Sequence, residues 1–391
     1  MAPRTILITG KGGVGKTSVA AATARRCAAA GQDTIVLSTD PAHSLADALG
    51  RPLGSEPERV GPRLWAQQVC AQEEMERNWA AVQAWLRPLL VERGVDRISA
   101  EELTVPPGLD ELFSLLALKR HHEEARFAVV VVDCAPTGET LRLLSFPDVA
   151  RWWLEKVFPQ QGSLMAAARP LARAVLDVSL PGDEVLDDVG RLVRGLIAMH
   201  EILRDTERAT VRLVMTPDRM VVDEARRTFT YLNLYGYVTD AVVVNRVFPP
   251  EVDGYFAGWR ERQLAALAEV ESAFAPVPVL PAPYFGEEVI GAAMLDRLGD
   301  AVFGERDAAS VLHDRVTQEL TVFDDGAQLR LDLPFVERGD VWLKKIGLEL
   351  VVRVDGHKRT LLLPPALAEF RPSGAALDRG ALRVSFDAPA G

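Results

Sequence analysis

A glycine-rich segment at residues 10–17 holds the side chains best suited to chemistry in this sequence. It fits the P-loop pattern, in which a tight turn wraps backbone N–H groups around phosphate oxygens at the start of a helix. Such a turn needs residues without side chains, and Gly10, Gly12, Gly13 and Gly15 meet that need. The segment therefore predicts a phosphate-binding site.

Two side chains of the segment can act on the bound phosphates. Lys16 can reach the β- and γ-phosphates, and the Thr17 hydroxyl can join the oxygen shell of a Mg²⁺ ion. Val14 and Ser18 complete the contacting stretch. An apolar strand at residues 6–9 precedes the loop and an alanine-rich helix follows it, as the motif requires. The alternative is a glycine-rich turn with an incidental lysine.

Lys11 stands too early in the loop to reach the phosphates of its own site as Lys16 does. One interpretation is a solvated loop lysine. However, the stretch from Lys11 to Thr17 resembles the deviant P-loop class, whose extra lysine points across a dimer interface toward the partner's nucleotide. That resemblance implies a homodimer.

Three more polar side chains follow apolar strands. Asp40 ends the strand at 33–39, where it could activate the water that attacks the γ-phosphate or simply cap a helix. Asp133 ends the strand at 127–132, in the position of a carboxylate that holds a Mg²⁺ water. Asn245 follows another strand, and its amide could contact an adenine edge or form a turn.

Alternating apolar strands and helices predict a doubly wound, mostly parallel α/β sheet for residues 1–305. The rhythm breaks in two helical blocks, about 70–125 and 146–205, which we expect to form a helical subdomain. The second block is rich in large apolar side chains, which serve either ordinary core packing or a groove for an apolar helix. The adjacent His121 and His122 are expected to be a surface pair and not a metal site.

The sequence changes character after residue 305. Residues 319–391 contain short runs of alternating apolar and polar residues separated by turns, which predict a small antiparallel β-sandwich. Residues 306–318 are the expected linker.

Composition excludes several classes of partner. The net charge of −11 and the absence of a basic stripe argue against nucleic acid. No apolar run approaches the roughly 20 residues of a membrane span, and residues 1–9 are expected to be a strand and not a signal peptide. We therefore expect a cytoplasmic protein without an integral membrane segment. Cys27, Cys70 and Cys134 stand far apart, without metal-ligand spacing.

Together, the segments at 11–17, 40–44 and 133–138 resemble the ArsA-like family of arsenite-pump and tail-anchored-protein targeting ATPases, over roughly residues 4–303. The resemblance implies ATP and Mg²⁺ as cofactors. It also implies that Lys11 crosses a dimer and that Asp133 opens a second switch segment.

The same resemblance assigns the remaining site residues. Asp40 would serve the attacking water, Asn245 would lie at the adenine, and residues 281–290, beginning with Pro281, would form the adenine loop. The C-terminal part resembles an α-crystallin, small heat-shock-type domain in the segments at 333–335 and 380–384.

The sequence also departs from the family pattern. Residues 245–275 contain no cysteine, although the eukaryotic targeting factor holds an interface zinc with paired cysteines there. The arsenite-binding cysteine cluster is absent, a single P-loop replaces the pump subunit's two, and Glu139 replaces a histidine common in the family.

Three functions remain open. The first is a dimeric ATPase switch that binds a hydrophobic client, such as a tail-anchored segment, and engages a membrane receptor. The second is the energising subunit of an arsenite or anion pump. The third is a holdase chaperone regulated by ATP.

Overall fold

The computed structural model describes residues 2–40, 44–77, 80, 83–84, 110–134, 183–252, 254–315, 318–323, 325–364 and 367–388. Most of the two expected helical blocks, including the apolar stretch at 146–182, lies outside the described residues. No helix in the described ranges is long and apolar enough to cross a membrane.

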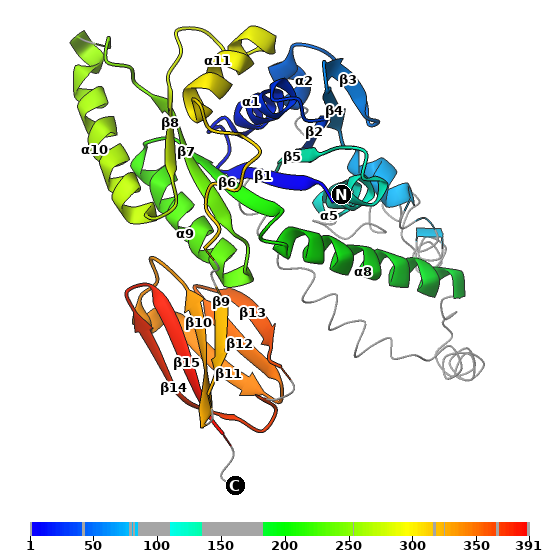
Figure 1. Cartoon of the computed structure of the whole chain (residues 1–391), viewed down its shortest axis with the longest axis vertical. Helices are drawn as coiled ribbons and strands as arrows, with labels where there is room; N and C mark the ends of the chain where they lie inside the picture. The colour runs from blue at the N-terminus through cyan, green and yellow to red at the C-terminus, as the bar shows by residue number, and fades with distance from the viewer. Residues whose placement is uncertain are drawn as a thin grey trace, which may run out of the picture.

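An eight-stranded sheet with the order β3-β4-β2-β5-β1-β6-β7-β8 forms the first domain (Figure 1). Every neighbouring pair is parallel except β3–β4. The central strands are continuous apolar runs because both faces of the sheet are covered. This confirms the doubly wound α/β fold. The strands are β1 Arg4–Gly10, β2 Thr34–Ser38, β3 Glu58–Gly61, β4 Leu64–Gln68, β5 Val129–Asp133, β6 Ala209–Met215, β7 Thr239–Val247 and β8 Val279–Pro283.

Helices cover both faces of this sheet, and alternate residues of β1 point into different cores. Ile6 and Ile8 pack with α1 and α11, whereas Leu7 packs with α5, α8 and the end of α9. A further cluster joins α9 and α10 to β6 and β7. The described helices are α1 Lys16–Ala29, α2 Ser44–Leu49, α5 Asp110–Glu124, α8 Asp183–Arg204, α9 Arg219–Tyr235, α10 Ala257–Phe274 and α11 Gly291–Phe303, with short 3₁₀ turns η1 Gly254–Phe256 and η2 Arg338–Asp340.

The edge strand β3 and its neighbour β4 lie where the sequence predicts no strand. The end of β4 is polar, yet Gln67 and Gln68 are both buried. Their amide nitrogens bind loop carbonyls, since Gln67 Nε2 donates to Ser55 O at 2.6 Å and Gln68 Nε2 donates to Asp40 O at 2.9 Å. Long-range hydrogen bonds therefore replace the apolar pattern that would reveal a strand.

The expectation of a surface pair at His121 and His122 is wrong. The His121 ring is buried and its Nε2 lies 2.8 Å from Gln67 Oε1, while His122 Nε2 lies 2.6 Å from Thr5 Oγ1. Both rings therefore bind the sheet from the last turn of α5. Within the described residues no group of three His, Cys, Asp or Glu side chains is arranged to hold a metal ion.

The C-terminal part is an antiparallel β-sandwich, as expected. One sheet has the order β14-β15-β10-β9 and the other β11-β12-β13. Alternate residues of β10, β12 and β15 fill the space between the sheets, including Leu331, Val352 and Phe386. The strands are β9 Gln318–Val322, β10 Gly326–Asp332, β11 Val341–Ile346, β12 Glu349–Val354, β13 His357–Leu362, β14 Arg371–Asp378 and β15 Ala381–Asp387.

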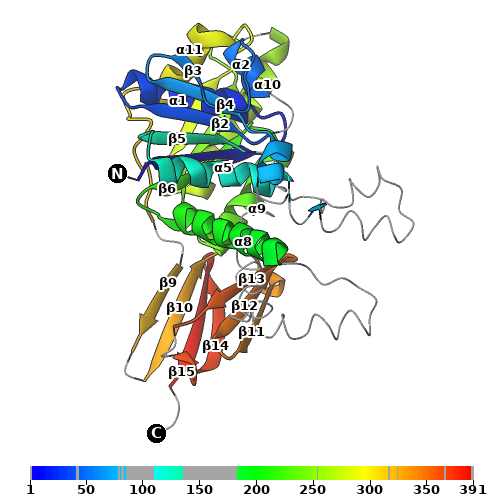
Figure 2. The ribbon, with the colours of Figure 1, turned by 90° about the vertical axis from the view of Figure 1, so that its right-hand side faces the viewer.

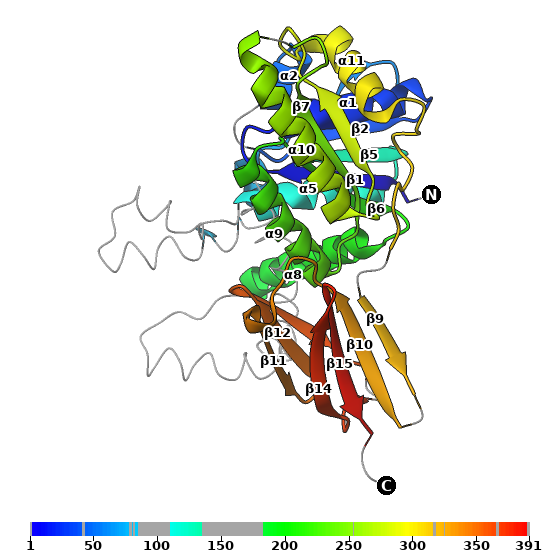
Figure 3. The ribbon, with the colours of Figure 1, turned by 90° about the vertical axis from the view of Figure 1, so that its left-hand side faces the viewer.

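The sandwich packs against the C-terminal half of α9, and Figures 2 and 3 show it below the first domain from opposite sides. Leu234 of α9 belongs to the sandwich core. Tyr231 Oη donates to Asp355 Oδ2 at 3.1 Å, and the buried Arg359 guanidinium donates to the Leu234 carbonyl. The two domains therefore share an apolar contact and a polar one at the same helix.

Candidate functional site

The glycine-rich loop takes backbone conformations that favour glycine. Gly13 and Gly15 have φ angles of +79° and +95°, and α1 begins directly afterwards at Lys16. A Cβ on Gly10 would lie 2.1 Å from the Val214 carbonyl oxygen of β6. Any larger residue at position 10 would therefore clash with β6 in this backbone conformation. The Lys16 ammonium is buried and donates to the Lys11 carbonyl at 3.3 Å. The loop thus has the geometry of a phosphate cradle at a helix N-terminus.

A buried carboxylate lies beneath this loop. Asp133 at the end of β5 is fully buried; its Oδ2 accepts from Ser38 Oγ at 3.3 Å, and its Oδ1 has no hydrogen-bond partner among the described residues. Burial raises the pKa of Asp133 to about 7 and the Asp40 charge adds to this, while the Thr17 hydroxyl and the Lys16 ammonium lower it. Asp133 therefore lies within electrostatic reach of Thr17, Lys16 and Asp40.

Asp133 and Thr17 suit a Mg²⁺ ion. The unpartnered Oδ1 of Asp133 is a hard oxygen ligand, and a divalent cation nearby would favour the ionised carboxylate that burial disfavours. Thr17 Oγ1 lies 3.0 Å from Ser44 Oγ, so a second hydroxyl stands next to it. The residues present therefore fit the cation that the P-loop pattern predicts.

Asp40 lies just past the end of β2, beside the same site. Its backbone N–H donates to Ser38 Oγ at 3.3 Å, so the Ser38 hydroxyl links Asp40 to Asp133. Its carbonyl accepts from Gln68 of β4, which fixes the turn after β2. The following residues 41–43 lie outside the described part of the chain.

A cavity of about 510 Å³ opens on the other side of the loop. Asn245 at the end of β7 is buried; its Nδ2 donates to the Val14 carbonyl at 2.9 Å and its Oδ1 accepts from the Arg246 N–H. Gly15, Ser18, Asn245, Arg246 and residues 283–289 line the cavity. The amide therefore joins the phosphate loop to a pocket of the size and position that a base would need.

The expected base contact of Pro281 differs from the structure. Pro281 lies within β8, pairs with Val244 and is exposed, and it does not line the cavity. The strand continues to Pro283, so the lining loop starts later than the sequence suggests. Its aromatic residues Tyr284 and Phe285 offer faces on which a base could stack.

The family profile for anion-transporting ATPases matches residues 3–304. The chain belongs to this family. It is an ATPase, and the cradle, the buried carboxylate and the base-sized cavity are the candidate parts of its nucleotide site. A second profile, an HSP20-like domain found in ArsA, matches residues 324–386 of the sandwich.

Full-length relatives carry the family's names. A protein of Chlorobaculum tepidum named as an arsenical pump-driving ATPase is 36% identical over 98% of this chain and 96% of its own length. One of Aquifex aeolicus with a similar name is 34% identical, over 97% of this chain and 99% of its own. The ATPase get3 of Aspergillus terreus is 29% identical over 76% of this chain and 89% of its own.

In this ATPase, Lys11 contacts a residue that sequence reasoning left without a role. Its Nζ lies 3.2 Å from Glu224 Oε2 on α9, and both side chains are partly exposed. Sequence reasoning also missed Ser38 and Gln68, which carry no motif. They end the neighbouring strands β2 and β4, and only the fold brings these strand ends together.

Proposed function

We propose that the chain is a homodimeric ATPase switch that binds a hydrophobic client, of the transmembrane-helix type, in an apolar groove whose opening depends on the bound nucleotide. The observation that carries the proposal is the second loop lysine, Lys11, in a chain related to ATPase get3. The apolar side chains of residues 146–182 would supply the groove. The proposed place of action is the cytoplasm, with a membrane receptor as a further partner.

Each site residue has a proposed role in hydrolysis. Lys16 and the loop N–H groups hold the phosphates, and Thr17 and Asp133 hold Mg²⁺, which when bound offsets the phosphate charge. Asp40 orients the attacking water or accepts its proton, and Asn245 contacts the adenine. Lys11 acts at the nucleotide of the partner chain.

The ion pair between Lys11 and Glu224 is compatible with this role. Exposed ion pairs contribute about 0–1 kcal/mol, so the lysine can leave Glu224 at little cost when a partner's nucleotide is in reach. Replacing Lys11 with alanine should lower ATP turnover far more than ATP binding, whereas Lys16→Ala should abolish binding. Equal turnover in Lys11→Ala and the unmodified chain would remove the case for a shared site.

Hydrolysis itself is tested at Asp40. The Asp40→Asn variant should bind ATP but lose turnover by at least about a hundredfold, the usual effect of removing a positioned base. Asp47→Asn is the matched control, because Asp47 is an exposed carboxylate on α2 and should leave turnover unchanged. Full activity in Asp40→Asn would exclude the proposed role.

Client binding needs a separate experiment. The Asp40→Asn variant is used so that bound ATP is not hydrolysed. The purified variant is mixed, with and without ATP, with a peptide that carries a tail-anchored helix and a photo-crosslinker. The matched control peptide has glutamines in place of half its leucines. Crosslinking that depends on nucleotide and on the leucines is expected, and a signal equal to the control would reject the client.

A pump-energising role is the second candidate, favoured by the names of the relatives in Chlorobaculum and Aquifex. Two of the three cysteines do not favour it. Cys27 and Cys134 are buried, and burial raises the pKa of both thiols to about 12, which disfavours the thiolates that bind arsenite. ATP turnover should therefore be unchanged by arsenite. Stimulation by arsenite would favour the pump role.

A further inference from the structure

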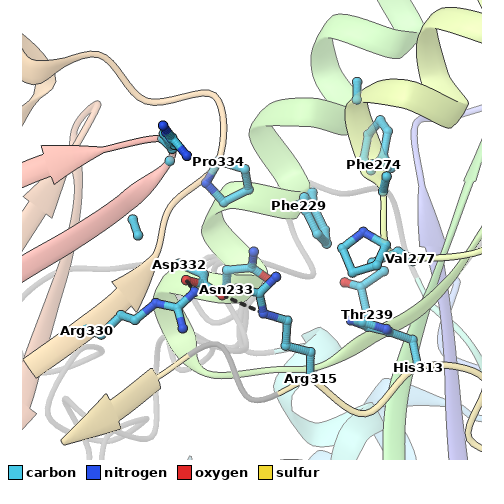
Figure 4. Close-up of a pocket in the computed structure, with 16 residues that line it drawn as sticks. Phe229, Asn233, Thr239, Phe274, Val277, His313, Arg315, Arg330, Asp332 and Pro334 are labelled. Carbon is cyan, nitrogen blue, oxygen red and sulfur yellow. Dashed lines mark ion pairs between the residues drawn. The ribbon is translucent and has the colours of Figure 1, made fainter. Parts of the chain in front are cut away.

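A second cavity, of about 160 Å³, lies between the two domains, away from the nucleotide loop (Figure 4). One wall comes from α9, α10, the start of β7 and the loop between α10 and β8, and the other comes from the sandwich. This volume is close to the ~150 Å³ of an engineered cavity that binds benzene. The site could therefore hold a molecule with a body the size of one ring.

Three arginines reach this cavity from different segments of the chain. Arg315 follows the first domain, Arg330 lies on β10 and Arg379 lies in the β14–β15 turn. Asp332 pairs with two of them, at 3.4 Å from Arg315 and 2.8 Å from Arg330. No carboxylate within the described ranges lies within ion-pair distance of Arg379. Among the side chains that line the cavity, three guanidinium groups therefore face one carboxylate.

A buried hydroxyl in the same cavity has no partner. Thr239, the first residue of β7, is 2% exposed, and its Oγ1 makes no hydrogen bond with any described residue. A buried hydroxyl that is left unsatisfied in this way destabilises the folded chain, and a ligand oxygen could satisfy it. His313 also lines the cavity, and burial lowers its pKa, so its ring adds no positive charge at neutral pH.

The backbone at Arg379 favours another residue. The turn between the paired Asp378 and Ala381 consists of Arg379 and Gly380, with φ angles of +47° and +74°. Two-residue hairpin turns with two positive φ angles strongly prefer asparagine and glycine. The chain thus holds an arginine at the cavity although asparagine would suit the turn better.

We propose that this cavity binds a small organic anion, with an oxyanion head held by the arginines and an apolar body against Phe229, Phe274 and Pro334. Carboxylates and phosphate monoesters share the required chemistry, because each presents two or more oxygens to guanidinium groups. The aromatic and proline side chains form the apolar part of the wall. The bound anion would join residues of both domains.

Titration calorimetry of the full chain tests the site, with saturating ADP and Mg²⁺ present so that the P-loop is occupied. Benzoate and phenyl phosphate carry the same ring on the two head groups, and benzyl alcohol is the uncharged control. At least one of the two anions should bind at one site per chain, and the tighter one identifies the head group. No binding of either anion, or equal binding of benzyl alcohol, would overturn the proposal.

Three variants tie the binding to these residues. Arg379→Asn should weaken it about tenfold or more while leaving the turn intact, and Thr239→Val should weaken it about two- to tenfold while leaving the free protein as stable or more stable. Arg383→Gln removes the same charge from an exposed position on β15 outside the cavity and should change affinity less than about twofold. Equal effects of Arg383→Gln and Arg379→Asn would mean nonspecific attraction, and unchanged affinity in both Arg379→Asn and Thr239→Val would place the anion elsewhere.

Discussion

Gly15 has two reasons to be glycine, and only one of them concerns phosphate. Its φ of +95° is strained for any side chain, as expected for a phosphate loop. In addition, a Cβ at this position would lie 2.3 Å from Nδ2 of Asn245, which hydrogen-bonds to the loop at Val14. The residue therefore makes room for the amide that joins the loop to the base-sized cavity.

A pair of loop variants separates these effects. Gly15→Ala should destabilise the nucleotide-free protein by about 1–3 kcal/mol, because of both backbone strain and the contact with Asn245. Gly12→Ala should change stability by less than about 0.5 kcal/mol, since a Cβ at Gly12 meets no atom within 4 Å. Denaturant unfolding without nucleotide measures both, and equal stabilities would contradict the packing argument.

His121 should make stability depend on pH. Burial lowers its pKa to about 4, so the unfolded chain, with a histidine near 6.5, binds the proton more strongly than the folded chain. Stability from this group is therefore full above pH 6.5 and falls as the pH drops toward 4. Between pH 7 and pH 5 the loss is about 2 kcal/mol.

The variant His121→Gln isolates this contribution. Its unfolding free energy should fall less steeply than that of the unmodified chain between pH 7 and pH 5, by about 2 kcal/mol. Taking the difference between the two proteins cancels the groups that they share. Parallel curves from urea unfolding would show that His121 does not titrate in this way.

At the scale of single residues, the sequence predicted those site residues that belong to a local motif. The loop glycines and Lys16 were identified by a strand, a glycine-rich turn and a helix that follow one another in the chain, and Asp133 by its place at the end of an apolar strand. The partner of Lys11 could not be predicted, because Glu224 lies on a distant helix and its position depends on how α9 packs on the sheet. The roles of the loop glycines, Lys16 and Asp133 in nucleotide binding stay predictions.

At the scale of elements, α9 links the loop to the sandwich. Its N-terminal half carries Glu224, which pairs with Lys11, and its C-terminal half carries Tyr231 and Leu234, which contact the sandwich. The hydrogen bonds of a helix keep its length nearly fixed. We expect a change at either end of α9 to affect the other.

Arg359 on β13 is the residue with which to test the contact between α9 and the sandwich. Replacing it with methionine should leave the Leu234 carbonyl without its donor and lower the unfolding free energy by about 1–3 kcal/mol. Lys358→Met is the control, because Lys358 is exposed on the same strand. If Arg359→Met matched the control in thermal and denaturant unfolding, the buried hydrogen bond would contribute nothing.

The sequence predicted helices and strands well where burial of one or both faces produces a regular pattern of apolar residues. The central strands are apolar runs and α9 shows a helical period, so both were identified. The strand β14 is exposed along nearly its whole length and β4 ends in buried glutamines, so neither has the expected alternation. Their strand structure depends on pairing with neighbours, which one segment of sequence does not reveal.

At the scale of the whole molecule, the short runs of alternating apolar and polar residues after residue 305 predicted a second domain. They did not predict how this domain contacts the first one. The contact needs Leu234 and Arg359, which lie more than a hundred residues apart and in segments assigned to different domains. Because the two domains share this contact, we expect the full chain to unfold in one transition that the nucleotide shifts upward. Two well-separated calorimetric transitions would contradict a shared core.

The packing of Leu234 has a practical consequence for anyone who shortens the chain. Ending it before residue 318 would uncover the apolar side of α9, including Leu234 and Phe229, and would leave a helix-end carbonyl without its donor. Such a fragment is expected to aggregate at high concentration, and loss of activity in it would then report poor solubility and not a missing function. A soluble fragment would need polar residues at these two positions first.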